Sequence, residues 1–299
     1  MKGTESNQSA RNPIFPRVTF LKGSGGLPLL DITTAWSAAQ IYLHGAHVTH
    51  FKRNGEPPLL FLSQRSRFET GQPIRGGIPV IFPWFGKRED LGGLHGFARH
   101  QPWELMEVAT ASDGAVTVRL RLPDCPDAPG CRPCTVEYVV TVGDSLAAEL
   151  IVTNKSDGEF VFENCLHTYF AVGDIHTVSV EGLSGVDYLD HLAGFARKTE
   201  TSDAIRFDRE VDRIYLDTPH TVVIRDPSLR RGVRIEKSGS ASTVVWNPWI
   251  AKAKAMPDFG DEEYRQMVCV ESGNVAANKI KLPPGESSSL KVILSSEPL

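Results

Sequence analysis

The chain has 299 residues, of which 41% are hydrophobic and 23% charged, as in an ordinary globular protein. Its net charge of −4 and pI near 6.2 argue against a nucleic-acid partner, which usually leaves a basic footprint. No run approaches the roughly 18 consecutive apolar residues of a membrane span, and the polar first ten residues lack the apolar stretch of a signal peptide. We therefore expect a cytoplasmic protein with no membrane partner.

Residues 1–16 are rich in Ser, Asn and Gly, which predicts a flexible leader. Beyond them we find neither a linker composition nor an internal repeat. We therefore expect residues 17–299 to form a single domain. The protein is also expected to be a monomer.

Short strands dominate the pattern. Apolar and polar residues alternate over 116–122, 136–142 and 146–152, and the Gly143-Asp144 turn predicts that the last two form a hairpin. Helical signal is sparse: short helices are expected at 63–68 and 249–255, and one turn at 261–264. Many short strands favour an all-β fold, a large antiparallel β-sandwich. Further strands are predicted at 221–225, 232–236, 242–247, 266–271, 279–282 and 289–294, the last two as a second hairpin.

The stretch from Arg75 to Arg99 combines two arginines, a histidine, glycine pairs and several aromatic residues. Pro79 and Pro83 fit poorly inside a central strand, so part of it should be edge strand or loop. An arginine fork suits phosphate or carboxylate. The alternative is a turn-rich connection whose arginines pair with acidic residues on the surface.

Two residues further along could carry proton transfer. Glu271 follows Met267 and Cys269 on one face of a predicted strand, where burial would raise its pKa and make it a better base. His167 has a side chain that can give and recover a proton near neutral pH. The alternatives are a glutamate that reaches solvent at the end of a strand, and a core histidine bonded to a backbone carbonyl.

Three segments of the stretch stand as RGGIP at 75–79, FPWFG at 82–86 and HGFAR at 95–99. In this combination they resemble the glucose-6-phosphate 1-epimerase (hexose-6-phosphate mutarotase) branch of the aldose 1-epimerase family. The resemblance extends over residues 31–294. It implies a twisted, galactose mutarotase-like sandwich of two large sheets. It also implies an isomerase that interconverts the α and β anomers of hexose 6-phosphates, with glucose 6-phosphate as the expected substrate.

The resemblance also implies roles for individual residues. Glu271, in VCVESGNV, would be the base, and His167, in HTYF, the acid that protonates the ring oxygen. Arg75 and Arg99 would hold the 6-phosphate, and His95 would contact the sugar near the ring oxygen. Ring opening by this acid and base needs no metal and no cofactor.

Asp212, in EVDRIY, would bind a sugar hydroxyl or position the acid histidine; the alternative is a turn cap before a strand. Leu94 stands where part of the family has a substrate-binding glutamine, so that contact should be absent or made by backbone. A lone CxxC, Cys131 to Cys134, lacks the four ligands of a structural zinc site.

Three other functions remain open at this point. The protein could be an epimerase of free aldoses, against which the arginine pair speaks. It could be a carbohydrate-binding protein of the same fold without activity, against which the presence of both His167 and Glu271 speaks. It could be a glycoside hydrolase, which would need one carboxylate on each side of the glycosidic bond. Only Glu271 lies in a sequence context typical of a catalytic carboxylate, which speaks against this function.

Overall fold

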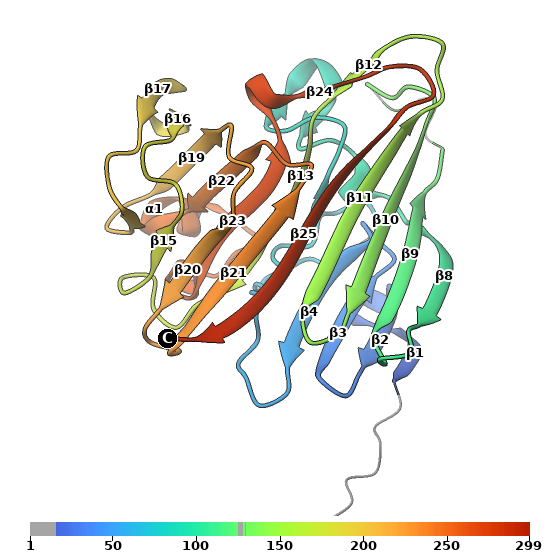
Figure 1. Cartoon of the computed structure of the whole chain (residues 1–299), viewed down its shortest axis with the longest axis horizontal. Helices are drawn as coiled ribbons and strands as arrows, with labels where there is room; N and C mark the ends of the chain where they lie inside the picture. The colour runs from blue at the N-terminus through green and yellow to red at the C-terminus, as the bar shows by residue number, and fades with distance from the viewer. Residues whose placement is uncertain (1–15, 125–127, 129) are drawn as a thin grey trace, which may run out of the picture.

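The computed structural model describes residues 16–124, 128 and 130–299. Strands dominate it, and the pairings in its large sheets are antiparallel. The first large sheet has nine strands in the order β18-β15-β20-β21-β25-β11-β10-β9-β8 (Figure 1). Their bounds are β18 (Ala204–Arg206), β15 (Ser179–Glu181), β20 (Val222–Asp226), β21 (Arg231–Ser238), β25 (Ser287–Pro298), β11 (Leu146–Asn154), β10 (Cys134–Val142), β9 (Val116–Leu122) and β8 (Glu104–Thr110).

The second large sheet has eight strands, seven in the order β17-β16-β19-β22-β23-β13-β5, with β14 paired to β23 off this path. A four-stranded sheet, β1 to β4, is formed by the first described part of the chain. The bounds are β17 (Ala196–Thr199), β16 (Asp187–Asp190), β19 (Val211–Leu216), β22 (Ser242–Asn247), β23 (Met267–Asn274), β13 (Asn164–Leu166), β5 (Val80–Ile81), β14 (Tyr169–Ala171), β1 (Arg17–Lys22), β2 (Pro28–Thr33), β3 (Ser37–Tyr42) and β4 (His47–Arg53).

Short elements complete the described chain. Two small sheets pair β12 with β24 and β6 with β7. In the described part of the chain, no helix combines the length and apolarity that crossing a bilayer requires. The bounds are β12 (Phe160–Phe162), β24 (Ile280–Leu282), β6 (Lys87–Arg88), β7 (Gly93–Leu94), α1 (Trp249–Ala255), and the 3-10 turns η1 (Ser24–Gly26), η2 (Glu89–Leu91), η3 (Ala98–His100), η4 (His191–Ala193), η5 (Glu263–Gln266) and η6 (Ala276–Asn278).

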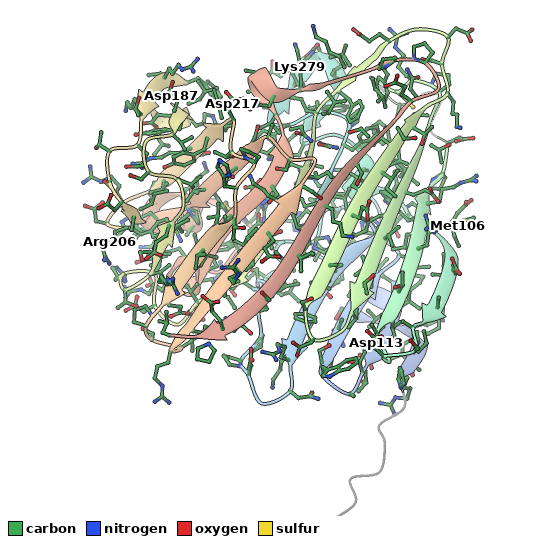
Figure 2. The ribbon with its side chains drawn as sticks, viewed as in Figure 1. Met106, Asp113, Asp187, Arg206, Asp217 and Lys279 are labelled. Atoms are coloured by element: carbon green, nitrogen blue, oxygen red, sulfur yellow. The ribbon has the colours of Figure 1, made fainter. Side chains whose placement is uncertain are left out.

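The core lies between the nine-stranded sheet on one side and the eight-stranded and four-stranded sheets on the other. Strands β9, β10 and β11 alternate buried with partly exposed residues, so each offers one face to this core. Strand β10 contacts β3, and β25 contacts β23, which joins the three layers into one apolar cluster. At the outer edge, β8 is mostly exposed, and Met106 points away from the molecule (Figure 2).

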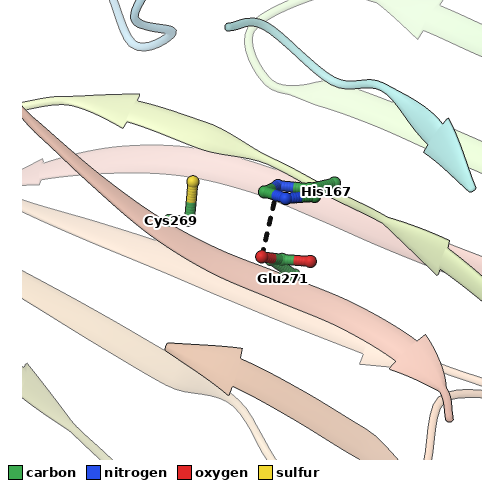
Figure 3. A group of neighbouring side chains, drawn as sticks. All are labelled: His167, Cys269 and Glu271. Atoms are coloured by element: carbon green, nitrogen blue, oxygen red, sulfur yellow. Dashed lines mark ion pairs between the residues drawn. The ribbon is translucent and has the colours of Figure 1, made fainter. Parts of the chain in front are cut away.

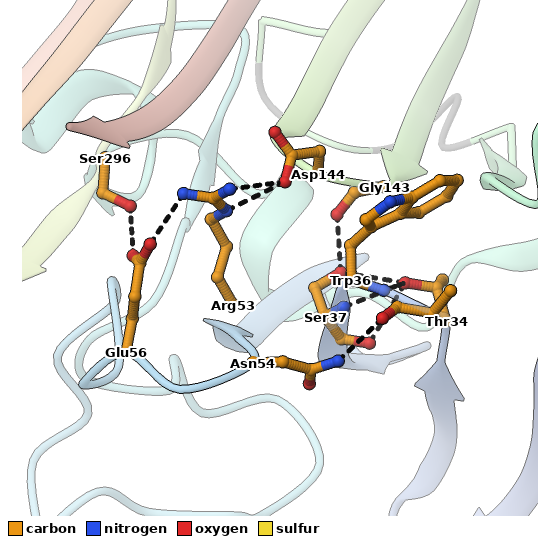
Figure 4. A network of polar contacts seen from close by, with 10 residues as sticks. Thr34, Trp36, Ser37, Arg53, Asn54, Glu56, Gly143, Asp144 and Ser296 are labelled. Atoms are coloured by element: carbon orange, nitrogen blue, oxygen red, sulfur yellow. Dashed lines mark hydrogen bonds and ion pairs between the residues drawn. The ribbon is translucent and has the colours of Figure 1, made fainter. Parts of the chain in front are cut away.

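Polar contacts join the four-stranded sheet to the nine-stranded one. Arg53 donates two hydrogen bonds to Oδ1 of Asp144, at 2.6 and 3.0 Å, and an ion pair links it to Glu56 (Figure 4). The hydroxyl of Ser37 donates to the backbone oxygen of Gly143 at 2.6 Å. These contacts fix the hairpin turn between β10 and β11 against the end of β4.

Most of the expected elements are confirmed. The all-β sandwich, the β10–β11 hairpin and helix α1 are present, and the stretch between Arg75 and Arg99 is largely loop. Two predictions were wrong. Residues 63–68 form a turn rather than a helix, and β24 pairs with β12 rather than in a hairpin with β25. Strand β25 instead pairs with β11 and β21 in the nine-stranded sheet, where its alternate side chains are buried. Of the predicted leader, residues 1–15 lie outside the described residues.

Candidate active site

A gap in one strand ladder places His167 beside Glu271. Strand β13 pairs with β23 up to Leu166, and β14 pairs with the same strand from Tyr169 onward. His167 lies in the gap between these two ladders, opposite Glu271. Its Nδ1 is 3.2 Å from Oε1 of Glu271 (Figure 3). Two residues far apart in the sequence thus become cross-strand neighbours.

Both side chains are buried, which changes their acidity. Burial raises the pKa of the Glu271 carboxyl well above its ordinary value. Burial, together with the charges of Arg99 and Arg75, holds the pKa of His167 well below its ordinary value. Within the described residues, Nδ1 of His167 makes no hydrogen bond, so its approach to Glu271 is close but poorly aligned. Catalytic contacts are often loose without substrate and tighten in the complex.

His95 contacts the ring of His167 edge-on and also lines the cavity. Its ring centroid is 5.5 Å from that of His167. The backbone N–H of Gly86 donates to Nδ1 of His95 at 3.1 Å, so in the neutral ring the proton is on Nε2. Burial lowers the pKa of His95 well below its usual value and keeps the ring neutral. Its φ of 65° is uncommon for a residue other than glycine and often accompanies a functional site.

Arg75 is held from two sides. Its Nε and Nη2 lie 3.1 and 3.0 Å from Oδ2 of Asp258, and its Nη1 donates to the hydroxyl of Tyr169 at 3.0 Å. Burial disfavours the charge, but Tyr169 and Asp258 outweigh it and raise the pKa of Arg75. The ring of Tyr169 also stacks on His167, with centroids 4.8 Å apart and planes within 9°. Arg75 and the histidine therefore share one rigid support.

Glycines allow this loop to approach β4. A Cβ on Gly77 would stand 2.2 Å from the backbone oxygen of Val48, and the φ of Gly77 is +60°. His47, which is buried on β4, lies with its Nε2 at 2.7 Å from the backbone oxygen of Gly76. The RGGIP segment is thus fixed by backbone contacts that larger residues would prevent.

Arg99 is almost fully buried, and its side chain lies behind the cavity wall. Its Nη2 donates to the backbone oxygen of Leu94 at 2.9 Å, whereas its Nε has no hydrogen-bond partner in the described structure. Burial and the nearby charge of Arg75 lower the pKa of Arg99 to about 10. A buried donor without a partner is costly. None of the acidic residues expected in the surface-pair alternative contacts it in the described chain.

A cavity of about 430 Å³ collects most of the predicted site residues, which is within the usual size for a small-molecule site. Aromatic and aliphatic side chains make up part of its wall, including Phe85 and Trp246. Arg99 is not part of the wall. The predicted residues that line the cavity are Arg75, His95, His167, Asp212 and Glu271.

Asp212 lies on β19 rather than at a turn, which excludes the turn cap. Oδ2 of Asp212 is 2.8 Å from Nδ1 of His191 and 3.6 Å from Nζ of Lys252. The histidine that Asp212 contacts is thus His191. Lys252 also stands over the ring of Trp246, 5.9 Å from its centroid.

Sequence reasoning missed several residues of the cavity. Lys252 could have been placed, because it lies about one helical turn into the helix predicted at residues 249–255. His191 lines the cavity from the short turn η4, and Asp258 holds Arg75 from a loop behind the cavity; neither residue carries a local signal in the sequence. Tyr169 was part of the HTYF segment but was given no role. Leu94 lines the cavity and is exposed, and it uses its backbone oxygen to hold Arg99.

Comparison with known proteins supports a sugar epimerase. The family model described as aldose 1-epimerase matches residues 28–295. A protein from Cenchrus ciliaris named "Putative glucose-6-phosphate 1-epimerase" is 41% identical over 296 residues, covering 95% of this chain and 89% of the relative. A protein of the same name from Escherichia coli strain K12 is 36% identical, covering 82% and 83%. A crystal structure from Salmonella typhimurium, titled "a putative mutarotase (YeaD)", superposes with a TM-score of 0.87 at 29% identity, covering 94% of each chain.

Proposed function

Because the chain belongs to the aldose 1-epimerase family and is an isomerase that interconverts sugar anomers, we propose that its substrate is a hexose 6-phosphate, with glucose 6-phosphate as the first candidate. The observation that supports this specificity is the position of two guanidinium groups beside the acid–base pair. Arg75 lines the cavity, and Arg99 lies close enough for its charge to act on both His167 and Glu271. The names of the relatives point to the same substrate.

The cavity residues suit a simple sequence of proton transfers. Glu271, as a carboxylate, takes the proton of the C1 hydroxyl while His167 gives a proton to the ring oxygen. The bond between C1 and the ring oxygen breaks, which leaves an open-chain aldehyde. After rotation about C1–C2, the C5 hydroxyl attacks the other face of C1. Its proton returns to His167, and the proton on Glu271 returns to the C1 oxygen, so both residues recover their starting states.

His95 and Asp212 would hold the ring during this cycle. The Nε2–H of His95 is a donor of fixed orientation beside His167, suited to the ring oxygen or a neighbouring hydroxyl. Asp212 offers a carboxylate to a hydroxyl on the side of the cavity where Lys252 and His191 lie. Fixed partners of this kind lower the entropic cost of reaching the reactive geometry.

A bound phosphate would also favour the acid. In the free protein the charges of Arg99 and Arg75 disfavour a protonated His167. A phosphate dianion next to these guanidinium groups would offset their charge and make the imidazolium easier to form. Arg75, which lines the cavity, is the guanidinium that such an anion could meet directly, whereas the buried Arg99 would act on it through its charge. The phosphate would thus act both as an anchor and as an electrostatic partner of the acid.

The test compares phosphorylated and free sugar. Anomer exchange of glucose 6-phosphate and of glucose is followed by NMR with wild-type protein, Arg75→Gln and the control Arg65→Gln, whose arginine pairs with Asp261 on the surface. Loss of one charge-assisted contact should raise KM for glucose 6-phosphate by about 10- to 100-fold. KM for glucose should change little. Equal effects on the two sugars would instead favour an epimerase of free aldoses.

A further inference from the structure

Three potential metal ligands meet at the floor of the cavity. Nδ1 or Nε2 of His167, Sγ of Cys269 and a carboxylate oxygen of Glu271 all lie within 4.8 Å of one another, and all three residues are buried (Figure 3). The acid–base chemistry described above uses the histidine and the glutamate but gives no task to the thiol.

The strand register places the thiol of Cys269 on the same face of the sheet as Glu271. Cys269 and Glu271 are two residues apart on β23, so their side chains leave the same face of the sheet. His167 reaches this face from the gap between β13 and β14. Cys269 is free and wholly inaccessible to solvent, whereas His167 and Glu271 line the cavity above it. An ion that entered the cavity would meet these two residues first and the sulfur beneath them.

A second observation points to a ligand at this place. Nδ1 of His167 is buried and has no hydrogen-bond partner in the described structure, although it lies 3.2 Å from Oε1 of Glu271. A buried ring nitrogen without a partner is uncommon in native proteins. It is also the atom that a metal ion between His167 and Glu271 would bind.

We propose that His167, Cys269 and Glu271 form a binding site for Zn²⁺ that inhibits the enzyme. One nitrogen, one sulfur and one carboxylate oxygen suit this borderline-soft ion better than Mg²⁺ or Ca²⁺, which prefer oxygen alone. Three protein ligands leave a fourth position for water, as in an open zinc site. With bonds of about 2.1 Å to nitrogen and oxygen and 2.3 Å to sulfur, tetrahedral ligand atoms stand about 3.4–3.6 Å apart. The N–O pair is already near this spacing, and a small side-chain movement brings in the sulfur.

The ligands can balance the charge of the ion once they have lost their protons. The carboxylate of Glu271 and the thiolate of Cys269 carry two negative charges, which match the ion. The thiol proton and any proton on Glu271 pass to solvent as the ion binds. The ion then binds the carboxylate oxygen of Glu271 that would take the C1 proton. It also binds the imidazole ring of His167, the proton donor, so anomer exchange stops.

The experiment measures metal binding apart from activity. A variant with Cys125, Cys131 and Cys134 changed to Ser keeps Cys165 and Cys269, the buried thiols of the described chain, and removes the other three cysteines. This protein, freed of metal with a chelator, is titrated with Cd²⁺, and thiolate-to-Cd²⁺ charge-transfer absorption is recorded in the ultraviolet. We expect one Cd²⁺ per chain. Anomer exchange by the wild type should fall with added Zn²⁺ and recover with EDTA.

Two further substitutions identify the ligands. Cys269→Ser in the same background should abolish the absorption, and His167→Ala, which keeps the thiol, should weaken Cd²⁺ binding by more than about tenfold. Cys165→Ser is the matched control, because the thiol of Cys165 donates to Oε2 of Glu271 at 3.5 Å and a serine hydroxyl can keep that contact. It removes the other buried thiol on this sheet and should leave the absorption in place. Absence of absorption in the background variant, or absorption that survives Cys269→Ser, would overturn the proposal. Neither result depends on which sugar is the substrate.

Discussion

Oδ2 of Asp258 binds Arg75 through both Nε and Nη2, at 3.1 and 3.0 Å, and so fixes the plane of the guanidinium at the cavity wall. Asp258 follows helix α1 and reaches the site from the loop before η5. On its other side, Arg75 donates to Tyr169, whose ring stacks on His167, the proposed acid. The orientation of the proposed phosphate ligand is thus tied to the orientation of the acid.

The first prediction concerns Asp258 as a positioning residue. Asp258→Ala removes two of the three contacts that orient Arg75, so KM for glucose 6-phosphate should rise by about tenfold while kcat changes less. Asp258→Asn retains an acceptor and should restore most of the affinity. Asp261→Ala, which frees only the surface residue Arg65, is the control. A purely structural role would instead lower thermal stability without this split between KM and kcat.

The second prediction concerns the base. Glu271→Gln keeps the shape of the side chain but cannot take a proton, so kcat for anomer exchange should fall by about 10²–10⁴-fold. The melting temperature should change little, because the amide fits the same buried site. NMR exchange spectroscopy gives the rate above the uncatalysed background, and circular dichroism gives the melting temperature. Near-normal turnover by a folded Glu271→Gln protein would contradict the assignment.

The third prediction is a pH dependence. Burial raises the pKa of Glu271 above the ordinary value of 4.5, so the carboxylate should take up its proton at higher pH than an exposed glutamate. Because only the carboxylate can act as base, kcat should fall as the pH is lowered through this raised pKa. A ¹³C NMR titration of labelled glutamate, with the Glu271 signal assigned by its absence in Glu271→Gln, measures the midpoint directly. A midpoint at or below 4.5 would refute the prediction.

The fourth prediction concerns acid stability. Burial lowers the pKa of His47 from 6.5 to about 3. Below pH 6.5 the unfolded chain takes up a proton here and the native protein does not, so stability falls as the pH drops from 6.5 towards 3. The loss from this site reaches about 4 kcal/mol at pH 3.

A variant pair isolates this effect. His47→Gln cannot titrate and can still donate to Gly76, so its unfolding free energy should depend less steeply on pH between 6.5 and 4 than that of the wild type. His220→Gln, at an exposed position, should leave the slope unchanged. Denaturant unfolding at several pH values supplies the free energies. Equal slopes for wild type and His47→Gln would exclude His47 as a source of acid lability.

The sequence by itself determined the class of the fold and the residue types of the site. Period-two alternation located β9, β10 and β11, because a strand with one buried face imposes that period on its residues. The RGGIP and HGFAR segments identified Arg75, His95 and Arg99 through resemblance. The glycines of these segments allow close backbone contacts. At Gly77, for example, a Cβ would not fit beside the backbone of Val48.

Only the tertiary structure decided which residues meet. The gap between β13 and β14 is invisible in the sequence, because both segments have ordinary strand composition, and it is this gap that sets His167 opposite Glu271. Asp258 holds Arg75 from a loop and His191 lines the cavity from the short turn η4, and no periodicity in the sequence marks either residue. The partner of β24 was mispredicted because proximity in sequence favours a hairpin, whereas the long β25 buries more of its alternate side chains within the nine-stranded sheet. Local pattern fixes which face of a strand is buried, but contacts between distant segments depend on the packing of the whole chain.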